Sequence, residues 1–517
     1  MFGGVEALEE VVLPRLLPVA LSLLAVLLLV TPAQAQRVVW GPCPGALAAL
    51  ECTTLSVPLD YAHPDQGAIA VVVSRRQAAD PAHRKGVLLI NPGGPGGSGL
   101  SMPRYIADHT PLGQFYDLVG FDPRGVGAST ALRCLTPRGL ADLDSRPADD
   151  QLVAWAADAR ESEDACQRSG GGIRPFIDTR DTARDMDQIR GALGVAKINY
   201  LGYSYGTYLG AAYGSLFPDR LNLSVLDSSV HPEWIWRKQF MEQAAAYRSD
   251  VDAWASWVGD RNGAFGLGVG RAAVLATVEQ LAGTLAKSPV GRFNRSTLDG
   301  AVGEGARYRP LWSDLAQVLM SLRKGNDPSV GDAVSAGLAL AQRSLDSLQS
   351  GVFDTVTCEA DWPGDLSTYY QDMQTYRDSF PYGFGVLRAA PTTCTYRSFT
   401  PAEPPVSLQR NGYPVGVVVQ AEGDTQTEYA GGPAMAQRLR DNLITVADEG
   451  QHGEYGTNPC VNEKINRYFV DGVLPDSSSV CAGSPRPDVP ADAPATPTRA
   501  ATLGQSVRGY LSGLAPF

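Results

Sequence analysis

The sequence predicts an α/β fold in which a mostly parallel sheet is covered by helices on both faces and interrupted by a helical insertion. Between residues 87 and 227, short apolar runs that end in glycine-rich or acidic turns alternate with segments of helical periodicity. The alternation stops near residue 231, where mainly helical patterns begin, and it resumes at residue 415. Because buried parallel strands are near-continuous apolar runs separated by helices, this pattern indicates a parallel sheet with an insertion.

The apolar runs and the helical spacings define the expected elements. After an antiparallel hairpin, we expect core strands at 87–91, 116–121, 198–201, 224–226, 415–420 and 443–446. Expected helices lie at 178–193, 205–217, 272–285, 334–348 and 434–439. The resulting division is a first core part at 36–230, a helical cap at 231–405, a second core part at 406–482 and a Pro/Ala-rich tail at 483–517. We expect the tail to be extended and mobile.

Length and composition limit the class of protein. The chain has 517 residues, of which 44% are hydrophobic and 19% charged, and this globular composition excludes disorder as the overall state. At this length we expect one large domain with an insertion, or two domains. The net charge is −12 and no block of Lys or Arg stands out, so the sequence lacks the basic stripe that nucleic-acid binding requires.

The first 35 residues have the pattern of a signal peptide. The apolar run at 16–30 is short for a membrane span, and the small residues Ala33 and Ala35 fit cleavage before Gln36. The segment before this run is acidic rather than basic, and translation from residue 11 or 12 would give a conventional signal. We therefore expect a secreted or periplasmic protein, with an uncleaved membrane anchor as the alternative.

The cysteines are consistent with export. Eight are present, and an even number behind a signal peptide favours disulfides. Of the roughly 105 possible connectivities, we expect the one between sequential neighbours. Its pairs are Cys43 with Cys52, Cys134 with Cys166, Cys358 with Cys394, and Cys460 with Cys481. No Cys-x-x-Cys pair occurs and no histidine lies at zinc-ligand spacing, so we expect neither a metal nor a cofactor.

The strongest chemical signal is the G-x-S-x-G pattern at 202–206, in which Ser204 is the central residue. A nucleophilic serine in such a pattern lies in a tight, strained turn, so the residues two before and two after it must lack bulk. Chance matches are common in a chain with 55 glycines, but here a strand precedes the pattern and a helix follows it. This context predicts an α/β-hydrolase fold with Ser204 as the nucleophile. An ordinary Gly-rich turn is the alternative.

A second glycine-rich segment, NPGGPGGSG at 91–99, directly follows an expected strand. Acyl transfer needs donors where negative charge develops, and glycine allows a backbone N–H to approach closely. We expect the backbone N–H groups of Gly94 and Tyr205 to form the oxyanion hole. A phosphate-binding loop would need a following Lys and Ser/Thr or dinucleotide-type glycine spacing, which this segment lacks. A purely structural loop remains an alternative.

A serine needs a base, and the chain has only five histidines. In this fold the order along the chain is nucleophile, acid, histidine. Two histidines follow Ser204, and only His452 lies after the resumed core, whereas His231 opens the cap. We therefore expect His452 to be the base, and a histidine on a surface loop is the alternative.

The acid is expected at the end of a strand that precedes the histidine, where it fixes the imidazole tautomer. Asp424 follows the strand at 415–420 and fits this position, with Glu422 and Asp227 as rivals. Asp122 and Arg124 close another strand, and we expect them to form a buried brace rather than to take part in catalysis.

Five motifs occur in order between Cys52 and Cys481: INPGGPGGSG, FDPRGVGAST, NYLGYSYGTYLGAAY, EGDTQTEYAGG and GQHG. Together they resemble the secreted tripeptidyl aminopeptidases of actinobacteria and relatives, in the prolyl-aminopeptidase-like branch of the α/β-hydrolases. Two departures occur. Many members have Asp-x-x-Thr-Pro after the acid, whereas this chain has DTQTE at 424–428, and Gln451 is inserted between Gly450 and His452.

The resemblance implies exopeptidase action on free N-termini, with the cap limiting how much peptide enters. It also implies that an acid of the cap holds the substrate amine, because a buried carboxylate is a suitable counter-charge. Glu359 and Asp361 are the candidates, and the alternative is that both are solvated on a cap loop. Several members are instead carboxylesterases or act on small metabolites.

The sequence therefore predicts a secreted serine exopeptidase of tripeptidyl or prolyl type that acts through Ser204, His452 and Asp424. The alternatives are a carboxylesterase or small-metabolite hydrolase of the same fold and, in another class, a non-catalytic binding protein. The expected partner is a peptide or a small ester or amide. We expect a monomer without a nucleic-acid partner and without stable membrane association after signal cleavage.

Overall fold

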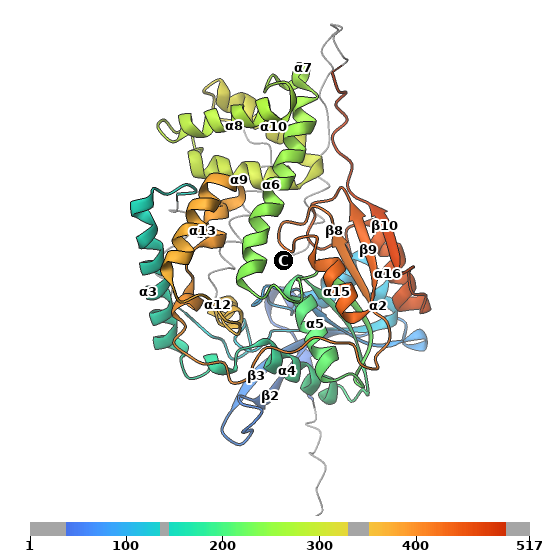
Figure 1. The fold of residues 1–517 in the computed structure, drawn as a ribbon. Coiled ribbons are helices and arrows are strands. Elements are labelled where there is room, and N and C mark those ends of the chain that lie inside the picture. Colours follow the sequence, from blue (N-terminus) through green and yellow to red (C-terminus); the bar gives the residue numbers. More distant parts are fainter. Residues whose placement is uncertain (1–37, 135–143, 329–350, 493–517) are drawn as a thin grey trace, which may run out of the picture. The chain divides into compact units, whose positions relative to one another are not determined.

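The computed structural model describes residues 38–134, 144–328 and 351–492. In this part of the chain, ten strands form one sheet in the order β1-β2-β3-β5-β4-β6-β7-β8-β9-β10 (Figure 1). The strands are β1 (Gly41–Pro42), β2 (Glu51–Pro58), β3 (Ala68–Arg76), β4 (Gly86–Asn91), β5 (Tyr116–Phe121), β6 (Ile198–Tyr203), β7 (Leu221–Asp227), β8 (Val417–Ala421), β9 (Asn442–Ala447) and β10 (Ser478–Ala482). From β5 to β10 neighbouring strands are parallel, and β1, β2 and β3 add an antiparallel edge.

The predicted fold class is confirmed. Every expected core strand is present, and the expected hairpin is the β2–β3 pair. The strand β10 was not expected, because five residues of alternating burial at the sheet edge give only a weak apolar signal. The signal-peptide segment, the expected helix at 334–348 and tail residues 493–517 lie outside the described residues.

Alternating strand residues build two separate cores, one on each face of the sheet. Val87 and Leu89 of β4 join the core that contains α4 (Thr179–Ala192), α5 (Tyr205–Leu216) and α15 (Gly431–Leu439). Leu88 and Ile90 join the opposite core, with α1 (Met102–His109) and α16 (Pro459–Asn466); the short α2 (Leu112–Phe115) also lies on this face. The sheet is therefore covered on both faces, and the loops at the carboxyl ends of its strands remain available for a site.

The described residues between β7 and β8 form helices and add no strand to the sheet. These helices of the cap are α6 (Arg237–Gly259), α7 (Asn262–Phe265), α8 (Gly270–Leu285), α9 (Arg295–Arg307), α10 (Trp312–Arg323), α12 (Gly351–Thr357), α13 (Leu366–Ser379) and α14 (Gly385–Ala389). Four of them, α6, α8, α9 and α10, share a hydrophobic core around Trp254 and Trp312. In the parts of the chain that the structure describes, no helix has the length and apolar character needed to cross a membrane.

One helix that precedes β6 also packs on the cap. Leu152 of α3 (Leu152–Gly170) shares a small core with Met373 of α13 and Val386 of α14. Figure 1 shows α3 alongside α13. Helices from two separate insertions therefore contribute to the region around the cap, whereas the sequence indicated only one insertion.

The first ten residues of the expected tail, 483–492, which we call the strap, make backbone contacts with the cap, and the mobility of the tail stays a prediction. The strap rises from β10 toward α7 (Figure 1). The backbone oxygen of Val489 accepts a hydrogen bond from Arg261 over 2.6 Å, and the N–H of Asp492 donates to the Asp260 carbonyl over 2.8 Å. Val489 is buried in the cap core. The proline-rich composition keeps the segment extended, and these backbone partners hold it in place.

All four expected disulfides are formed: Cys43–Cys52, Cys134–Cys166, Cys358–Cys394 and Cys460–Cys481. The last of them joins α16 to β10, and the third joins the end of α12 to the segment after α14. Disulfides persist in oxidising compartments, so this pattern is typical of exported proteins.

Candidate active site

Ser204 lies in a sharp turn between β6 and α5 with a positive φ of 57°. This conformation is strained for a residue with a side chain, and it is found at nucleophile turns of this kind. A Cβ atom on Gly202 would lie 2.4 Å from the Gly206 carbonyl oxygen, and one on Gly206 would lie 2.8 Å from the Asn91 carbonyl oxygen. The turn therefore cannot form with larger residues at 202 or 206, as the pattern predicts.

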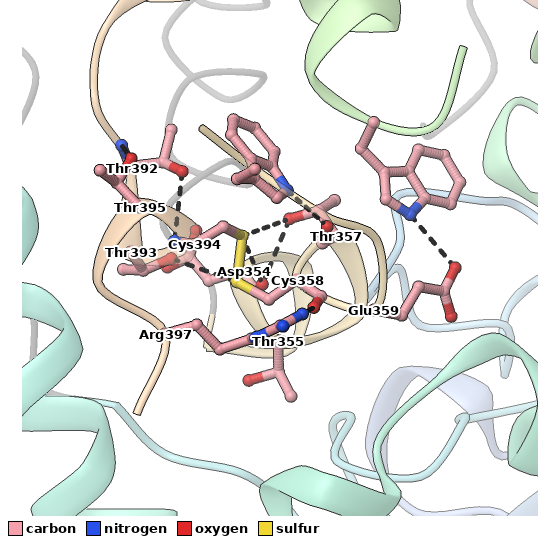
Figure 2. Close-up of a disulfide and its surroundings, with 12 residues drawn as sticks. Asp354, Thr355, Thr357, Cys358, Glu359, Thr392, Thr393, Cys394, Thr395 and Arg397 are labelled. Atoms are coloured by element: carbon pink, nitrogen blue, oxygen red, sulfur yellow. Dashed lines mark hydrogen bonds between the residues drawn. A yellow bond between two sulfur atoms is a disulfide. The ribbon is translucent and has the colours of Figure 1, made fainter. Parts of the chain in front are cut away.

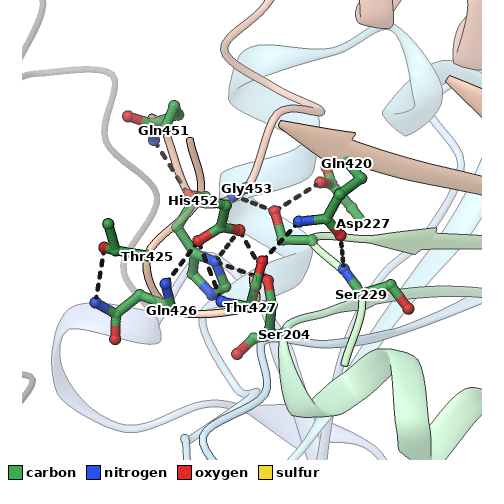
Figure 3. A network of polar contacts seen from close by, with 12 residues as sticks. Ser204, Asp227, Ser229, Gln420, Thr425, Gln426, Thr427, Gln451, His452 and Gly453 are labelled. Atoms are coloured by element: carbon green, nitrogen blue, oxygen red, sulfur yellow. Dashed lines mark hydrogen bonds and ion pairs between the residues drawn. The ribbon is translucent and has the colours of Figure 1, made fainter. Parts of the chain in front are cut away.

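The turn that carries Ser204 and the loop after β9 that carries His452 are both attached to the end of β7. We call them the nucleophile turn and the histidine loop. The N–H of Ser204 donates to the Asp227 carbonyl over 3.0 Å. In the histidine loop, the N–H of Gly453 donates to the Ser228 hydroxyl over 2.8 Å. Because residues 227 and 228 are adjacent, the segments that carry Ser204 and His452 meet there. Figure 3 shows Ser204 close to His452 in a network of polar contacts.

His452 and Asp424 form a buried pair. Nδ1 of the imidazole lies 2.7 Å from Oδ2 of Asp424, whose side chain is fully buried. The same oxygen accepts the hydroxyl of Thr427 over 2.8 Å, and Oδ1 accepts the N–H of Gln426 over 2.8 Å. Burial alone would raise the pKa of Asp424, but the charge and hydrogen bond of His452 and the charge of Arg307 hold it below its ordinary value. The acid is therefore ionised beside the imidazole.

The two rival acids have other partners. The carboxylate of Asp227 accepts the N–H of Tyr455 over 2.6 Å and that of Glu454 over 2.9 Å. Burial raises the pKa of Asp227 to about 6. The carboxylate of Glu422 accepts the N–H of Asp448 over 2.9 Å. Asp227 therefore holds the segment that follows His452. Position along the chain alone could not distinguish this role from that of the residue that contacts the imidazole.

The glycine-rich segment after β4 packs directly against the nucleophile turn. A Cβ atom on Gly93 would lie 2.8 Å from the Ser204 Cβ and 3.1 Å from the Tyr205 nitrogen. The N–H of Gly93 donates to the Asn91 side chain over 2.9 Å, so it is committed within the loop. Gly94 is the next residue, and it is exposed. Tyr205 begins α5, where an N–H has no partner within the helix. These positions fit the expected oxyanion donors, Gly94 and Tyr205.

Asp122 and Arg124 are buried, but they do not pair with each other in the way a simple brace would. Asp122 accepts the Ser98 hydroxyl and the N–H of Ala128. Arg124 donates to both carboxylate oxygens of Asp185, over 2.8 and 2.7 Å. The turn therefore connects the glycine-rich loop to the body of α4.

The two candidate amine-binding acids differ sharply in environment. Glu359 is buried, and its carboxylate accepts the N–H and the hydroxyl of Thr179, each over 2.9 Å, and the indole N–H of Trp236 over 3.1 Å. Burial raises the pKa of Glu359 to about 7. The side chain of Asp361, by contrast, is fully exposed, and its nearest ion-pair partner, Arg397, is 3.9 Å away. Only Glu359 is the buried carboxylate that an amine site requires.

Glu359 is connected to the nucleophile turn through one residue. The hydroxyl of Thr179 lies 3.0 Å from the hydroxyl of Tyr205, the residue after Ser204. The disulfide Cys358–Cys394 holds the chain immediately before Glu359 (Figure 2). This acid therefore has a fixed position on the cap side of the candidate site.

Sequence reasoning missed the cap residues that touch the segments around Asp424 and His452. The side chain of Gln243 donates to the Gln426 carbonyl over 2.7 Å, and Nε of Arg307 donates to the Gly450 carbonyl over 2.8 Å. Neither residue lies in a recognisable motif. The contact of Thr427 with Asp424 was also not predicted, but Thr427 belongs to the segment DTQTE that carries Asp424, and this motif is a signal that could have identified it.

Two family descriptions match the chain. Residues 86–329 match the family described as "alpha/beta hydrolase fold", and residues 381–481 match the one described as "TAP-like protein".

Relatives match over most of the chain. A tripeptidyl aminopeptidase of Streptomyces lividans is 33% identical over 459 residues, which cover 85% of this chain and 85% of the relative. The serine protease Hip1 of Mycobacterium tuberculosis is 29% identical over 490 residues, which cover 87% of this chain and 92% of that protein. Carboxylesterase B of Mycobacterium tuberculosis is 32% identical over 479 residues, which cover 87% and 91%. These relatives thus include two proteins named as peptidases and one named as an esterase.

Proposed function

Because the chain belongs to the family of the tripeptidyl aminopeptidases, serine hydrolases of the α/β-hydrolase fold, we propose that it is a secreted exopeptidase that cleaves short peptides from a free N-terminus. Ser204 is the nucleophile, His452 the general base and Asp424 the acid of its triad. The observation that carries this proposal is the buried 2.7 Å contact between Nδ1 of His452 and Asp424. A base oriented in this way presents its other ring nitrogen to a serine hydroxyl.

The reaction follows from the placement of these groups. The Ser204 hydroxyl attacks the scissile carbonyl carbon while Nε2 of His452 takes its proton. The tetrahedral oxyanion accepts hydrogen bonds from the N–H groups of Gly94 and Tyr205. His452 then gives the proton to the leaving amine, and an acyl-enzyme remains on Ser204. Water, activated by His452, attacks this ester and releases the N-terminal fragment.

The preference for a free N-terminus is attributed to Glu359. A protonated amine needs a counter-charge when it leaves water, and this acid is buried on the cap side of the site. Its carboxylate already accepts hydrogen bonds from Thr179 and Trp236, which hold it in one orientation. The exposed Asp361 lacks these features, so we do not assign it to the amine site.

Two other functions are compatible with some of these observations. A carboxylesterase is supported by the relative named carboxylesterase B, and it would use the same triad. A non-catalytic binding protein of this fold would be expected to lack a triad member, whereas this sequence retains all three. Secretion is supported by the signal-peptide pattern and by the disulfides, and N-terminal sequencing of the exported protein should begin at Gln36.

The proposal is tested by two measurements on the purified protein. A fluorophosphonate probe should label the parent protein and fail to label Ser204→Ala, and label retained in that variant would refute the nucleophile. Tripeptide arylamides with a free amine should be hydrolysed much faster than the N-acetylated forms. Equal rates on both, or activity restricted to aryl esters, would favour the esterase.

A further inference from the structure

The cap contacts the histidine loop through a buried arginine. Arg307 is the last residue of α9, and its Nε donates to the Gly450 carbonyl over 2.8 Å, two residues before His452. The approach is close, because a Cβ atom on Gly450 would lie 2.0 Å from the Arg307 carbonyl oxygen. The same carbonyl of Arg307 accepts a hydrogen bond from Arg309 over 2.8 Å. The end of α9 is therefore fixed against the loop that carries the catalytic base.

The cap also contacts the turn that carries the acid. On α6, Gln243 donates to the Gln426 carbonyl over 2.7 Å, and the Gln426 side chain donates to the Tyr247 hydroxyl over 3.0 Å. Tyr247 in turn donates to Glu304 on α9, and Glu304 lies 3.6 Å from the Arg307 guanidinium. These contacts form one connected path from the acid turn, through the cap, to the histidine loop.

The charge of Arg307 acts on Asp424. Arg307 is 4% exposed, and the guanidinium is one of the charges that hold the pKa of Asp424 below its ordinary value. Burying a guanidinium is costly unless it is paired. A neutral residue could anchor a helix end at lower cost, so a buried cation that pairs with Glu304 and also lowers the pKa of Asp424 points to an electrostatic role.

We propose that Arg307 is a positioning residue of the active site, which holds the His452 loop in place through Gly450. The cap then takes part in fixing the triad, in addition to limiting access. This inference rests on the triad proposed above, and it concerns a residue for which the sequence gives no motif.

A competing explanation is that Arg307 only anchors the cap. An anchor would affect the free energy of unfolding, but the folded fraction would keep the parent kcat and the parent pH profile. A positioning residue changes kcat while leaving KM close to the parent value, because the geometry of the triad matters in the transition state. The two explanations therefore differ in kinetics and not in stability.

The test uses variants of the full exported chain. Arg307→Gln removes both the charge and the Nε–H donor to Gly450, and it should lower kcat ~10- to 100-fold with KM within ~3-fold of the parent. Arg307→Lys keeps the charge and loses the planar donor, so its loss of kcat should be smaller. The matched control is Arg146→Gln, which breaks a part-buried ion pair with Asp299 of α9, the helix that ends at Arg307, and Arg146 contacts neither the His452 loop nor the acid turn. It should keep the parent kcat.

The pH profile provides the readout that an anchor would not change. Without the charge of Arg307, Asp424 binds a proton more readily, so activity on the acid side should begin to fall at higher pH. A shift of roughly half a pH unit or more is expected in Arg307→Gln and not in Arg307→Lys. The other titratable or charged groups around this pair or Arg307 include Asp227, Asp250, Glu304, Glu428, Glu454, Tyr247, Tyr308, Arg309 and Arg388. They are the same in both variants.

The outcomes separate this inference from the proposed function. If a fluorophosphonate fails to label Ser204 in the parent protein, the triad itself is refuted. If the parent is labelled but Arg307→Gln has the parent kcat and pH profile, the positioning role is overturned. If Arg307→Gln does not fold, the double variant Glu304→Gln/Arg307→Gln removes the pair without leaving an unpaired charge. Parent kcat in that folded double variant would equally overturn the role.

Discussion

The carboxylate of Asp227 accepts the backbone N–H of Tyr455 over 2.6 Å, three residues beyond His452. The carbonyl of the same aspartate accepts the N–H of Ser204 over 3.0 Å. One residue at the end of β7 therefore holds both the nucleophile turn and the histidine loop. The acid that contacts the imidazole is a different residue, Asp424, at the end of β8.

This division of roles predicts losses of kcat of very different size for two similar substitutions. Asp424→Asn should lower kcat about 10,000-fold, because it loses the charge and favours the wrong imidazole tautomer. Asp227→Asn should lower kcat far less, because an amide oxygen still accepts the N–H groups of Glu454 and Tyr455. Steady-state kinetics on a tripeptide arylamide measures both. A loss in Asp227→Asn as large as that in Asp424→Asn would assign the acid to Asp227.

The glycine-rich loop gives a second prediction. Gly93→Ala should lower kcat strongly, because its Cβ would lie 2.8 Å from the Ser204 Cβ and 2.5 Å from the Tyr203 carbonyl oxygen. Gly412→Ala is the matched control, since both glycines have a φ of 100° but nothing lies within 4 Å of a Cβ at 412. Both variants should lose about 1 kcal/mol or more of stability from the strained φ. Only Gly93→Ala should lose activity, and equal kcat values would contradict the packing argument.

Glu359 and Asp361 provide a matched pair for substrate recognition. Glu359→Gln should raise KM for peptides with a free N-terminus and change KM for N-acetylated ones little, because only the former present a cation. Asp361→Asn should change neither, since its side chain is fully exposed. A KM increase of ~10-fold or more is expected for Glu359→Gln, from the loss of a buried charge-assisted contact. Equal effects on free and acetylated substrates would instead indicate a structural role for Glu359.

The titration of Glu359 predicts a pH dependence of the same step. Burial raises its pKa to about 7, so the carboxylate is charged only above that pH in the free protein. The substrate amine loses its proton above about pH 8. KM for free-amine substrates should therefore fall as the pH rises through 7 and rise again above about 8. In Glu359→Gln the fall near pH 7 should be absent, and a fall that persists would assign it to another group.

The parts of the site that could be predicted from the sequence are those with a local physical signature. The turn at Ser204 needs two glycines between a strand and a helix, and a pattern of five residues reports that need. The contact between Arg307 and Gly450 joins residues 143 positions apart, and no short pattern encodes it. Asp227 is the last residue of β7 and Asp424 lies in the turn just after β8, so position along the chain could not separate their roles.

The amino-acid composition does not predict whether an extended segment is held by hydrogen bonds to distant residues. The segment at 483–492 has the proline-rich character of a linker, and its extended backbone is what composition indicates. Whether such a backbone is held depends on distant residues, here Arg261 and Asp260, which supply a donor and an acceptor. The alternation in β10 was likewise too short to distinguish from a loop.

The strap gives a final prediction, because it contacts both the cap and the histidine loop. Ser484 donates its N–H over 2.7 Å to Glu449, whose other carboxylate oxygen accepts the N–H groups of Gly450 and Gln451 beside His452. Further along, Arg486 pairs with Asp448 over 2.7 Å, and Val489 is buried in the cap core.

Truncation after residue 483 should therefore lower both stability and kcat. Loss of Val489 burial alone should cost about 1.5–3 kcal/mol in the free energy of unfolding, and Glu449 should lose one of the donors that fix the histidine loop. The control is truncation after residue 492, which keeps every strap contact described above. Thermal unfolding and arylamide kinetics on the two truncated proteins measure the difference. Because both truncated proteins lack residues 493–517, any difference between them comes from residues 484–492. Identical melting temperatures and identical kcat values would show that the strap contributes nothing to the cap or to the histidine loop.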